Sequence, residues 1–288
     1  MTYREAYEQG MRLLAENGIE EADTDARLLL EYVCHTEYQT LYTHGDRALD
    51  EIQWEVYVNY LKGRAERIPL QHLTHTQSFM GIDFYVNEHT LIPRSDTEIL
   101  VEEVMRYRHD GMAILDLCTG SGCVLLSLLR YSNGCFGVGT DISKEALAVA
   151  EGNAKTLGFA DKMKQGELLF LQGDLYDALE KTLPAFDVIV SNPPYIRSDV
   201  IPTLMPEVKE HEPHLALDGG GDGLDFYRRI IGGVPAVAKR ESALFFEIGA
   251  DQGNAVKELM LRAGCRDVQI VKDYAGLDRV VHGLWYAS

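Results

Sequence analysis

The chain has 288 residues, of which 46% are hydrophobic and 25% are charged, and its formal net charge is −18. These proportions are those of a globular protein, which excludes disordered and fibrous classes, and the length permits one large domain or two with a substantial core. An excess of acidic residues weighs against a protein that grips nucleic acid, because phosphate binding normally needs a basic face. A local basic patch is still compatible with it.

Membrane, secretory and metal-binding classes are also disfavoured. No apolar run approaches the roughly 18 to 20 residues of a membrane span, and residues 1–18 carry acids and lack the apolar centre of a signal peptide. We therefore expect a cytoplasmic protein. The five cysteines form no CxxC pair, which predicts buried reduced thiols. The close histidine pairs within 72–75 and 211–214 lack a third ligand, so we expect no metal site.

The sequence changes character twice along the chain. Residues 1–68 carry apolar residues at intervals of three and four, which predicts a small helical domain. Residues 69–92 alternate aromatic and β-branched residues around a glycine, which predicts a β-hairpin linker. Residues 93–288 form the third and largest part. It opens with a helix, where Ser95 and Glu98 have the spacing of a capping box.

From residue 113 onward, predicted strands and helices alternate. The strands are expected at 113–117, 135–140, 168–172, 186–190, 243–248, 267–272 and 279–287. Amphipathic helical segments between the first six strands are expected at 121–131, 143–158, 225–239 and 252–264. This alternation predicts an α/β fold with a mostly parallel sheet between layers of helices. Because only a short turn separates the last two strands, the last strand should pair antiparallel.

A glycine-containing turn joins the first strand of this region to its helix, at 114–129, where open α/β sheets bind nucleotide-like ligands. Gly120 and Gly122 do not continue into a dinucleotide fingerprint, because Leu125 stands where a third glycine is needed, and no phosphate-binding Lys-Ser/Thr follows. Asp116 would repel a pyrophosphate but suits a cofactor with amino and sulfonium charges. This description fits S-adenosylmethionine.

Two further strand ends support a cofactor site. Asp141 ends the second strand and is placed to accept hydrogen bonds from both hydroxyls of a ribose. After the third strand, Asp174 or Leu175 would meet the edge and face of an adenine. The structural alternatives are a tight turn without a ligand and, for Asp174, a helix N-cap.

The tetrapeptide Asn192-Pro193-Pro194-Tyr195 follows the fourth strand. An amide nitrogen is a poor nucleophile because its lone pair is delocalised, as the ~18–20 kcal/mol barrier to amide rotation shows. The side-chain carbonyl of Asn192 and the backbone carbonyl of Pro193 could hold both N–H bonds of one –NH2 group and turn its lone pair toward a methyl donor. The prolines fix the backbone, and Tyr195 offers a flat face. An ordinary Asn-Pro turn is the alternative.

On these residues the chain resembles class I S-adenosylmethionine-dependent methyltransferases of the HemK/PrmC family, the release factor glutamine methyltransferases. The resemblance spans nearly the whole chain and is carried by 68–102, 114–122, 192–195 and 212–224. The NPPY tetrapeptide is shared with DNA adenine methyltransferases. The stretches LIPRSDTE and ALDGGGDGL are more specific to the family.

The resemblance implies a Rossmann-like, seven-stranded and mostly parallel sheet with an antiparallel last strand, preceded by helices that recognise the substrate. Residues 93–288 would be the catalytic domain. The implied reaction, which needs no metal, methylates N5 of the glutamine in the Gly-Gly-Gln loop of class 1 peptide chain release factors and leaves S-adenosylhomocysteine. The implied cofactor-binding residues are Cys118, Thr119, Gly120, Ser121, Gly122, Asp141, Leu175 and Asn192. The implied catalytic and substrate-binding residues are Asn192, Pro193, Pro194 and Tyr195.

Two positions depart from the family pattern. Cys118 stands where many relatives have glycine, which requires residue 118 to avoid a left-handed backbone. Leu175 stands where an aromatic residue can cover the adenine, which weakens stacking. Arg94 or Glu98 could close the site over the substrate loop. Alternatively, Ser95 and Glu98 only cap their helix.

Other functions are compatible with the same motifs. Methylation of a ribosomal-protein glutamine shares the chemistry. Methylation of an exocyclic amino group of a nucleic-acid base would need a basic groove beside Tyr195, whereas the nearby Arg197 and Lys209 lie among acidic residues. A degenerate module that only binds S-adenosylmethionine is a third reading, against which the intact Asn192 argues.

Overall fold

The computed structural model describes residues 1–107 and 109–287, which form two compact units. The first unit comprises Met1–Thr76 together with Met205–His211. The second comprises Gln77–Leu204 and the chain from Glu212 onward. The helical first unit therefore takes in a short segment from far along the sequence.

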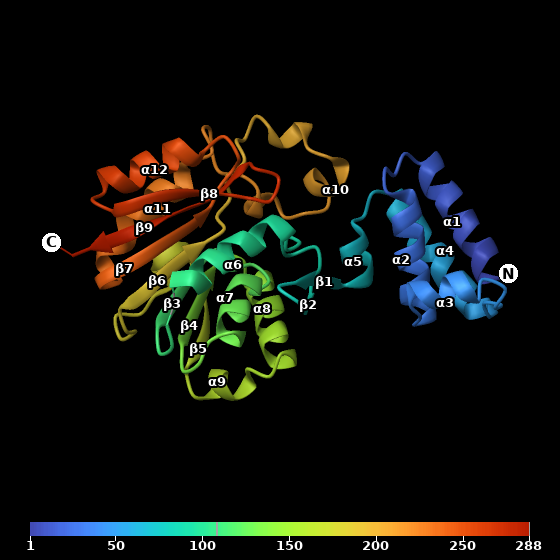
Figure 1. Cartoon of the computed structure of the whole chain (residues 1–288), viewed down its shortest axis with the longest axis horizontal. Coiled ribbons are helices and arrows are strands. Elements are labelled where there is room, and N and C mark those ends of the chain that lie inside the picture. The colour runs from blue at the N-terminus through green and yellow to red at the C-terminus, as the bar shows by residue number, and fades with distance from the viewer. Residues whose placement is uncertain (108, 288) are drawn as a thin grey trace. The chain divides into compact units, whose positions relative to one another are not determined.

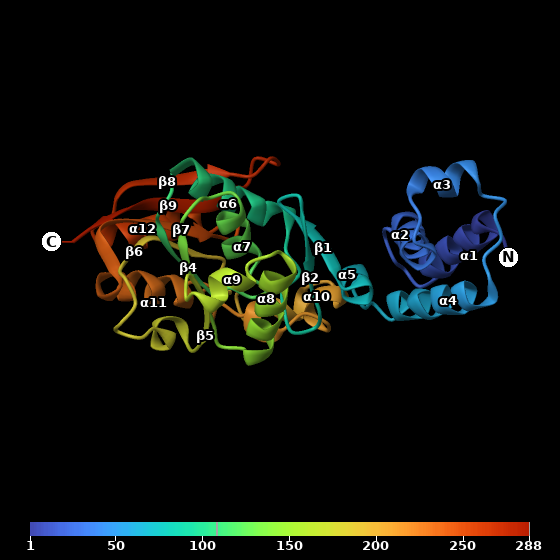
Figure 2. The same cartoon turned by 90° about the horizontal axis from the view of Figure 1, so that it is seen from below.

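Helices make up the first unit (Figure 2). They are α1 (Tyr3–Glu16), α2 (Ala22–Cys34), α3 (Tyr38–Thr43), α4 (Glu51–Ala65), α5 (Leu70–Thr74) and α10 (Pro206–Lys209). Capping boxes start α1 and α4, where the side chains of Thr2 and Asp50 accept backbone N–H groups. In the core, the Tyr57 hydroxyl donates to the carbonyl of Ala26 at 3.0 Å. Helix α5 lies within the segment 69–92, where the sequence predicted only a hairpin.

Ion pairs attach the segment Met205–His211 to the helices of the first unit. Arg64 of α4 lies 2.7 Å from Asp25 of α2 and 3.0 Å from Glu207 of α10. Arg67 lies 3.2 Å from the same Glu207 oxygen. Arg64 and Asp25 are buried, and a buried charge is tolerated only when it is paired. These pairs therefore fix where the segment docks.

A hairpin of β1 (Thr76–Phe79) and β2 (Ile82–Tyr85) comes before α6 (Ser95–Tyr107). Helix α6 begins at Ser95 itself, and the Glu98 carboxylate accepts the backbone N–H of Met80 at 2.6 Å. The prediction that Glu98 closes a capping box with Ser95 is therefore wrong. The hairpin turn uses the carboxylate instead, because Met80 would otherwise lack a partner for its N–H.

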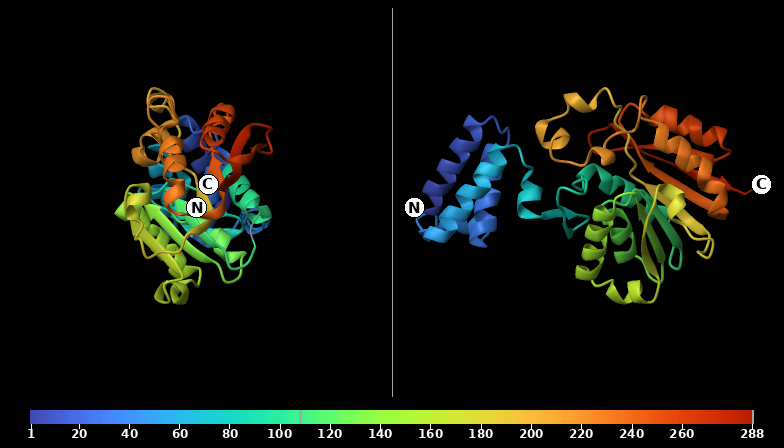
Figure 3. Two further views of the ribbon diagram at one scale, coloured as in Figure 1. Left: turned by 90° about the vertical axis from the view of Figure 1, so that its left-hand side faces the viewer. Right: turned by 180° about the vertical axis from the view of Figure 1, so that it is seen from behind.

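In the described part of the chain, seven strands form one sheet in the order β5-β4-β3-β6-β7-β9-β8 (Figures 1 and 3). They are β3 (Ala113–Leu117), β4 (Phe136–Asp141), β5 (Leu168–Gln172), β6 (Phe186–Ser191), β7 (Ala238–Glu247), β8 (Arg266–Lys272) and β9 (Asp278–Tyr286). The pairs among β3 to β7 are parallel, and β9 runs antiparallel to both β7 and β8. The seven predicted strands and the antiparallel last strand are confirmed, except that β7 begins at Ala238, five residues before its predicted start and inside the helix predicted at 225–239.

Helices cover both faces of the sheet, with α11 and α12 together on one of them (Figure 1). The remaining helices of this unit are α7 (Cys123–Arg130), α8 (Lys144–Thr156), α9 (Ala160–Lys164), α11 (Asp225–Gly233) and α12 (Gly253–Arg262). Successive strand residues point to opposite faces. Ile114 packs with α6 and α7, whereas Leu115 packs with α11 and α12. The α/β fold therefore has an apolar core on each side of the sheet.

The strand order reverses at β3. The chain runs from β3 outward to β4 and β5 and then returns to β6 on the other side of β3. Open α/β sheets bind ligands at such a switch point, outside the carboxyl ends of the strands. The glycine turn after β3, Asp141 at the end of β4 and the NPPY segment after β6 all leave the sheet at this edge.

Within the described residues, no helix combines the length and the apolar character that crossing a membrane requires. The cysteines Cys34, Cys118, Cys123, Cys135 and Cys265 are all free. The prediction of buried reduced thiols is confirmed for Cys123, Cys135 and Cys265, whereas Cys34 and Cys118 are reduced but only half-buried.

We expect Asn153 of α8 to be critical for stability. Its buried side chain accepts the Tyr85 N–H at 2.8 Å and donates to the carbonyls of Tyr85 and Ser121, each at 3.0 Å. Asn153→Leu should lower the free energy of unfolding by about 2–4 kcal/mol, because it removes three hydrogen bonds, one of them to the carbonyl of the buried Ser121. Urea denaturation measures this. The exposed Asn133→Ala is the matched control, and an equally small effect of both changes would contradict the expectation.

Candidate active site

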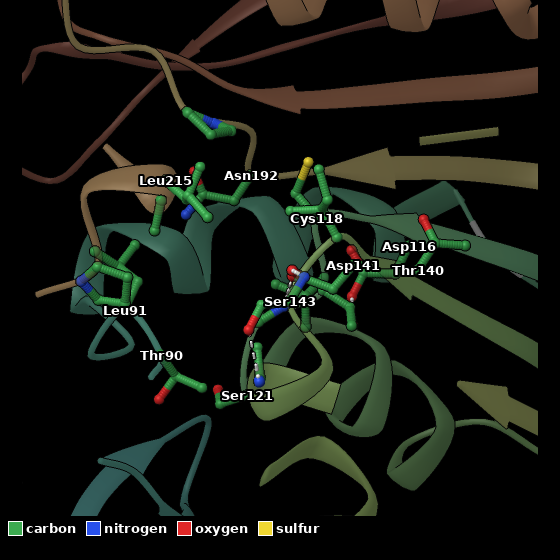
Figure 4. A pocket seen from close by; sticks show the side chains of 18 of the residues that line it. Thr90, Leu91, Asp116, Cys118, Ser121, Thr140, Asp141, Ser143, Asn192 and Leu215 are labelled. Atoms are coloured by element: carbon green, nitrogen blue, oxygen red, sulfur yellow. Dashed lines mark hydrogen bonds between the residues drawn. The ribbon is translucent and has the colours of Figure 1, made fainter. Parts of the chain in front are cut away.

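A cavity of about 370 Å³ opens at the switch point of the sheet (Figure 4). This volume is within the usual range of small-molecule sites. Its walls come from the loop before α6, the carboxyl ends of the central strands and the start of α11. The labelled lining residues are Thr90, Leu91, Asp116, Cys118, Ser121, Thr140, Asp141, Ser143, Asn192 and Leu215. The sequence therefore predicted the place of the cavity, and among the labelled polar residues it named Asp116, Ser121, Asp141 and Asn192 but not Thr90, Thr140 or Ser143.

The turn after β3 has a left-handed backbone at three positions. Gly120 and Gly122 have φ values of +55° and +79°, and Cys118 has a φ of +61°. The prediction that residue 118 avoids this conformation is therefore wrong. The surrounding turn imposes this left-handed conformation on whichever residue occupies position 118. A residue with a side chain adopts it at a free-energy cost of about 1–2 kcal/mol. Thr119 follows in the same turn and is buried, with its N–H donating to the carbonyl of Thr140 at 2.9 Å.

Asp116 is a buried carboxyl group in the wall of the cavity. It is 1% exposed, and the Thr119 hydroxyl donates to it at 2.6 Å. Burial raises the pKa of Asp116 to about 7, although the hydrogen bond from Thr119 opposes the shift. A cation bound beside Asp116 would favour its ionised form.

Asp141 ends β4 and is held by the backbone on both oxygens. Gly120 and Ser143 each donate an N–H to it at 2.9 Å. Burial nevertheless raises the pKa of Asp141. Because each carboxylate oxygen has a second lone pair, Asp141 can accept two more hydrogen bonds from a ligand in the cavity.

The segment after β5 meets the first turn of α11. Leu175 is buried and lines the cavity with a φ of +54°. Asp174 makes no capping bond to the following 3₁₀ helix, so the N-cap alternative is wrong. It pairs with Arg229 at 2.7 Å instead. The Arg229 guanidinium lies 5.6 Å from the ring centroid of Phe226, and both residues line the cavity.

Sequence reasoning missed Phe226 and Arg229. They lie three residues apart at the start of an amphipathic helix, a spacing that places two side chains on one face. This spacing could have indicated that the two side chains act together. The neighbouring sequence, however, does not show that this face of the helix meets Asp174.

The NPPY segment is divided between the cavity and the protein interior. Asn192 and Pro194 line the cavity, and Asn192 Nδ2 donates to the Thr97 hydroxyl at 3.4 Å. Pro193 is buried outside the described lining. Tyr195 packs with the core between the sheet and α11, and its hydroxyl donates to Glu247 at 3.3 Å. The structure thus brings Asn192 and Pro194 to the cavity and turns Tyr195 toward Glu247.

Glu247 lies at the end of β7 and is 2% exposed. Burial raises the pKa of Glu247 to about 7, and the Thr97 hydroxyl is the strongest of the groups that lower it. Sequence reasoning missed both Glu247 and Thr97. An acid at the end of the otherwise apolar run ALFFE was the available signal.

The loop before α6 is tied to a distant buried acid. Arg94 lies 2.7 Å from Glu212, and the Ile92 N–H donates to the same carboxylate at 3.2 Å. Burial raises the pKa of Glu212, and the charge of Arg94 opposes the shift. This pairing fixes the loop whose Leu91 and Pro93 line the cavity. Contact of Arg94 or Glu98 with a substrate stays a prediction.

Metal-ligating residues do not gather anywhere in the described chain. No three His, Cys, Asp or Glu side chains of residues 1–107 and 109–287 come together in a way that could hold a metal ion.

Comparisons with known proteins agree on one family. The description "PrmC N-terminal domain" matches residues 5–74, and "Methyltransferase domain" matches residues 108–217. The release factor glutamine methyltransferase of Clostridium acetobutylicum is 38% identical over 283 residues, covering 98% of each chain. That of Caulobacter vibrioides is 39% identical over 286 residues, covering 99% of this chain and 96% of its own.

This chain belongs to the release factor glutamine methyltransferase family. The resemblance stated from the sequence is thereby confirmed. The fold is also that of a class I methyltransferase. A methyltransferase structure from Pyrococcus furiosus, 16% identical, matches it with a TM-score of 0.54 over 77% of this chain and 98% of that one.

The cavity fits the methyl donor expected for this family. Asp116 offers a negative charge for amino and sulfonium groups, and Asp141 offers acceptors for a diol. Gly120 leaves open space where a side chain would otherwise stand. Among the described lining residues Arg229 is the only Lys or Arg, and Asp174 already neutralises it, so a pyrophosphate would find no free cation.

We expect the buried Asp116 to make stability fall as the pH rises. An ordinary aspartate has a pKa near 3.9, so between about pH 5 and 7 the folded state holds a proton that the unfolded state has lost. Stability should therefore decrease with pH in this window. Asp116→Asn should reduce the slope by at most about 1.4 kcal/mol per pH unit.

Urea unfolding of both proteins between about pH 5 and 8 measures this difference. Some slope should persist in the variant, because burial raises the pKa of Glu247 in the same direction. Identical slopes in the two proteins would show that Asp116 is ionised throughout.

Proposed function

We propose that this chain transfers a methyl group from S-adenosylmethionine to the side-chain amide nitrogen of the glutamine in the Gly-Gly-Gln loop of a peptide chain release factor. The names of its relatives point to this reaction. One observation carries the proposal: Asn192 lines the same cavity as Asp116 and Asp141. A side chain that can accept hydrogen bonds from a substrate –NH2 group therefore lies beside a pocket suited to the methyl donor.

The cofactor residues divide by chemistry. Asp141 accepts from the ribose hydroxyls, Asp116 faces the charged methionine part, and the Cys118–Gly122 turn lets the backbone approach closely. Leu175 covers one side of the adenine. S-adenosylmethionine supplies a methyl group activated by a positive sulfur, and S-adenosylhomocysteine is left.

The protein's own part in the reaction is to hold and orient the substrate nitrogen. Asn192 Oδ1 and the Pro193 carbonyl accept its two hydrogens, which draws electron density onto the nitrogen and directs its lone pair. The nitrogen gains a methyl group and gives up one proton, which leaves along these hydrogen bonds and ends on water. The prolines hold both oxygens in place before the substrate arrives. Tyr195 supports this loop from the core side, through its bond to Glu247.

Charge favours a protein substrate over a nucleic acid. The net charge is −18, and Arg197, the cation closest in sequence to Tyr195, pairs with Asp199. A phosphate backbone would gain little there. Release factors act where proteins are made, so the proposed reaction is cytoplasmic.

Mass spectrometry of a purified release factor tests the reaction. Incubation with the chain and S-adenosylmethionine should add the mass of one CH2 group to the peptide that contains Gly-Gly-Gln. Changing that glutamine to alanine should abolish the gain. Methylation of purified ribosomes or of nucleic acid in its place would support the alternative substrates and overturn this one.

Asn192→Ala should reduce kcat by about 10² to 10³, because it removes one preorganised acceptor from the nitrogen. Folding and most of the affinity for S-adenosylhomocysteine should persist, since Asp116 and Asp141 are unchanged. Single-turnover kinetics and calorimetry measure the two effects. A kcat within about threefold of the wild type would exclude Asn192 from the transition state.

Phe226 is proposed to supply the aromatic face that Leu175 lacks. It lines the cavity from α11, and the Arg229 guanidinium over its ring is itself paired with Asp174. The ring is thus held beside the segment expected to meet the adenine. The weak stacking predicted from Leu175 would then be compensated.

Phe226→Leu should weaken the binding of S-adenosylhomocysteine by about five- to 150-fold, because stacking of a base on an aromatic ring contributes about 1–3 kcal/mol. Calorimetry measures the dissociation constant. Tyr274→Leu is the control, since this exposed aromatic residue lies outside the described lining. Equal affinities of the two variants would remove Phe226 from the adenine site.

A further inference from the structure

The proposed chemistry gives no part to the glycine segment, residues 216–224 with the sequence ALDGGGDGL. The segment begins in the wall of the cavity, which Ala216 lines. It then runs beside the residue that follows the NPPY segment. The Ile196 N–H donates to the carbonyl of Leu217 at 3.0 Å, and the Gly219 N–H donates to the carbonyl of Ile196 at 2.8 Å. A short parallel bridge therefore joins the glycine segment to the end of the NPPY segment.

Gly219 lies directly against the backbone of the NPPY segment. A Cβ atom at this position would stand 2.7 Å from the Cα of Tyr195 and 2.8 Å from the carbonyl oxygen of Pro194. Non-bonded carbon atoms normally pack about 3.5–4.0 Å apart. Gly219 is buried, and its φ is not left-handed. Position 219 therefore needs a glycine for its small size beside the NPPY backbone, and not for its backbone conformation.

Gln252, the residue before α12, ties the glycine segment to the NPPY segment. Its side chain is buried, and Nε2 donates to the carbonyls of Tyr195 at 2.9 Å and Gly223 at 3.2 Å. Oε1 accepts the N–H of Gly249 at 2.9 Å. A backbone N–H only donates and a carbonyl only accepts, so these partners determine the orientation of the Gln252 amide. Gln252 thus holds the Tyr195 carbonyl beside the glycine segment.

The two prolines leave the carboxyl end of the NPPY segment unconstrained. Each proline fixes its own φ and restricts the ψ of the residue before it. The ψ of Pro194 and the ψ of Tyr195 are outside this constraint. These two angles orient the carbonyls of Pro194 and Tyr195, which are the groups that Gly219 and Gln252 contact. Contacts from outside the NPPY segment therefore complete the rigidity that the prolines begin.

We propose that Gly219 and Gln252 are positioning residues that hold the carboxyl end of the NPPY segment, so that Asn192 and the Pro193 carbonyl keep their places toward the substrate nitrogen. This inference rests on the proposed function. Neither Gly219 nor Gln252 is among the described residues that line the cavity. At its other end, the NPPY segment is fixed by the pairing of Ser191 with Leu117 in the sheet. A displacement at the carboxyl end must therefore be absorbed by the residues between.

Gly219→Ala tests this role, because its methyl group should displace the NPPY backbone by about 1 Å. We expect kcat to fall about ten- to a hundredfold, since a displacement of this size at reacting groups costs on the order of 10² in rate. KM for the release factor and the dissociation constant of S-adenosylhomocysteine should stay within about threefold. Steady-state kinetics and calorimetry measure these values.

Gly221→Ala is the matched control within the same segment. Gly221 is exposed, its φ is also not left-handed, and a Cβ atom there would meet no other group within 4 Å. This variant should keep the kcat of the wild type. A purely structural role of the segment would not predict a loss confined to position 219 and to kcat.

Gln252→Glu tests the hydrogen bonds, because it keeps the shape of the side chain and replaces the donating –NH2 group with an oxygen. An ionised carboxylate cannot donate to the carbonyls of Tyr195 and Gly223. We expect a loss of kcat similar to that of Gly219→Ala. Gln165→Glu, at an exposed position outside the described lining, adds the same charge and should leave kcat unchanged. Circular dichroism checks that each variant folds, and Gly219→Ala alone decides the outcome where Gln252→Glu does not.

Hydrogen exchange measured by NMR separates this inference from the proposed function, since it needs no release factor. The amide protons of Ile196 and of residue 219 should exchange faster in Gly219→Ala than in the wild type and in Gly221→Ala, because their bonds are loosened. If exchange changes in this way but the wild type methylates no release factor, the function fails and the positioning role stands. Unchanged exchange, or a kcat of Gly219→Ala within about threefold of the wild type, overturns the inference.

Discussion

The parallel pairing of β3 with β4 on one side and with β6 on the other is the interaction on which the site depends. It sets Leu117 opposite both Thr140 and Ser191, so that Cys118, Asp141 and Asn192 leave the sheet from adjacent positions. The Ser191 hydroxyl also donates to the carbonyl of Leu117 at 2.6 Å. Backbone hydrogen bonds in a buried sheet thereby place a cofactor turn beside an amide-binding loop.

Unfavourable features gather around the cavity that this pairing creates. Cys118 and Leu175 hold left-handed backbones, and burial raises the pKa values of Asp116 and Glu247. Such features persist only where the surrounding structure determines them, and they concentrate at functional sites. Two apolar cores on the faces of the sheet supply that rigidity. The stability of the fold thus supports a locally strained site.

The proposed chemistry rests on one physical idea. A neutral amide nitrogen needs its hydrogens held by acceptors whose positions are set in advance, because little else can raise its reactivity. Prolines provide this at the backbone, and the Asn192 side chain is held at the cavity by its hydrogen bond to the Thr97 hydroxyl. The mechanism then rests on orientation, and no residue has to remove a proton before the methyl group moves.

The sequence by itself determined the strands, the antiparallel end of the sheet, the glycine turn and the NPPY segment. These depend on alternation along a strand, on turn length and on the local geometry of glycine and proline. Only the tertiary structure decided how Glu98, Asp174 and Tyr195 are used. Their partners Met80, Arg229 and Glu247 lie 18 to 55 residues away. It also decided the backbone of Cys118, because packing around a turn and not the residue type fixes a bend. Side-chain pairing across such separations is set by folding in three dimensions, which local patterns do not encode.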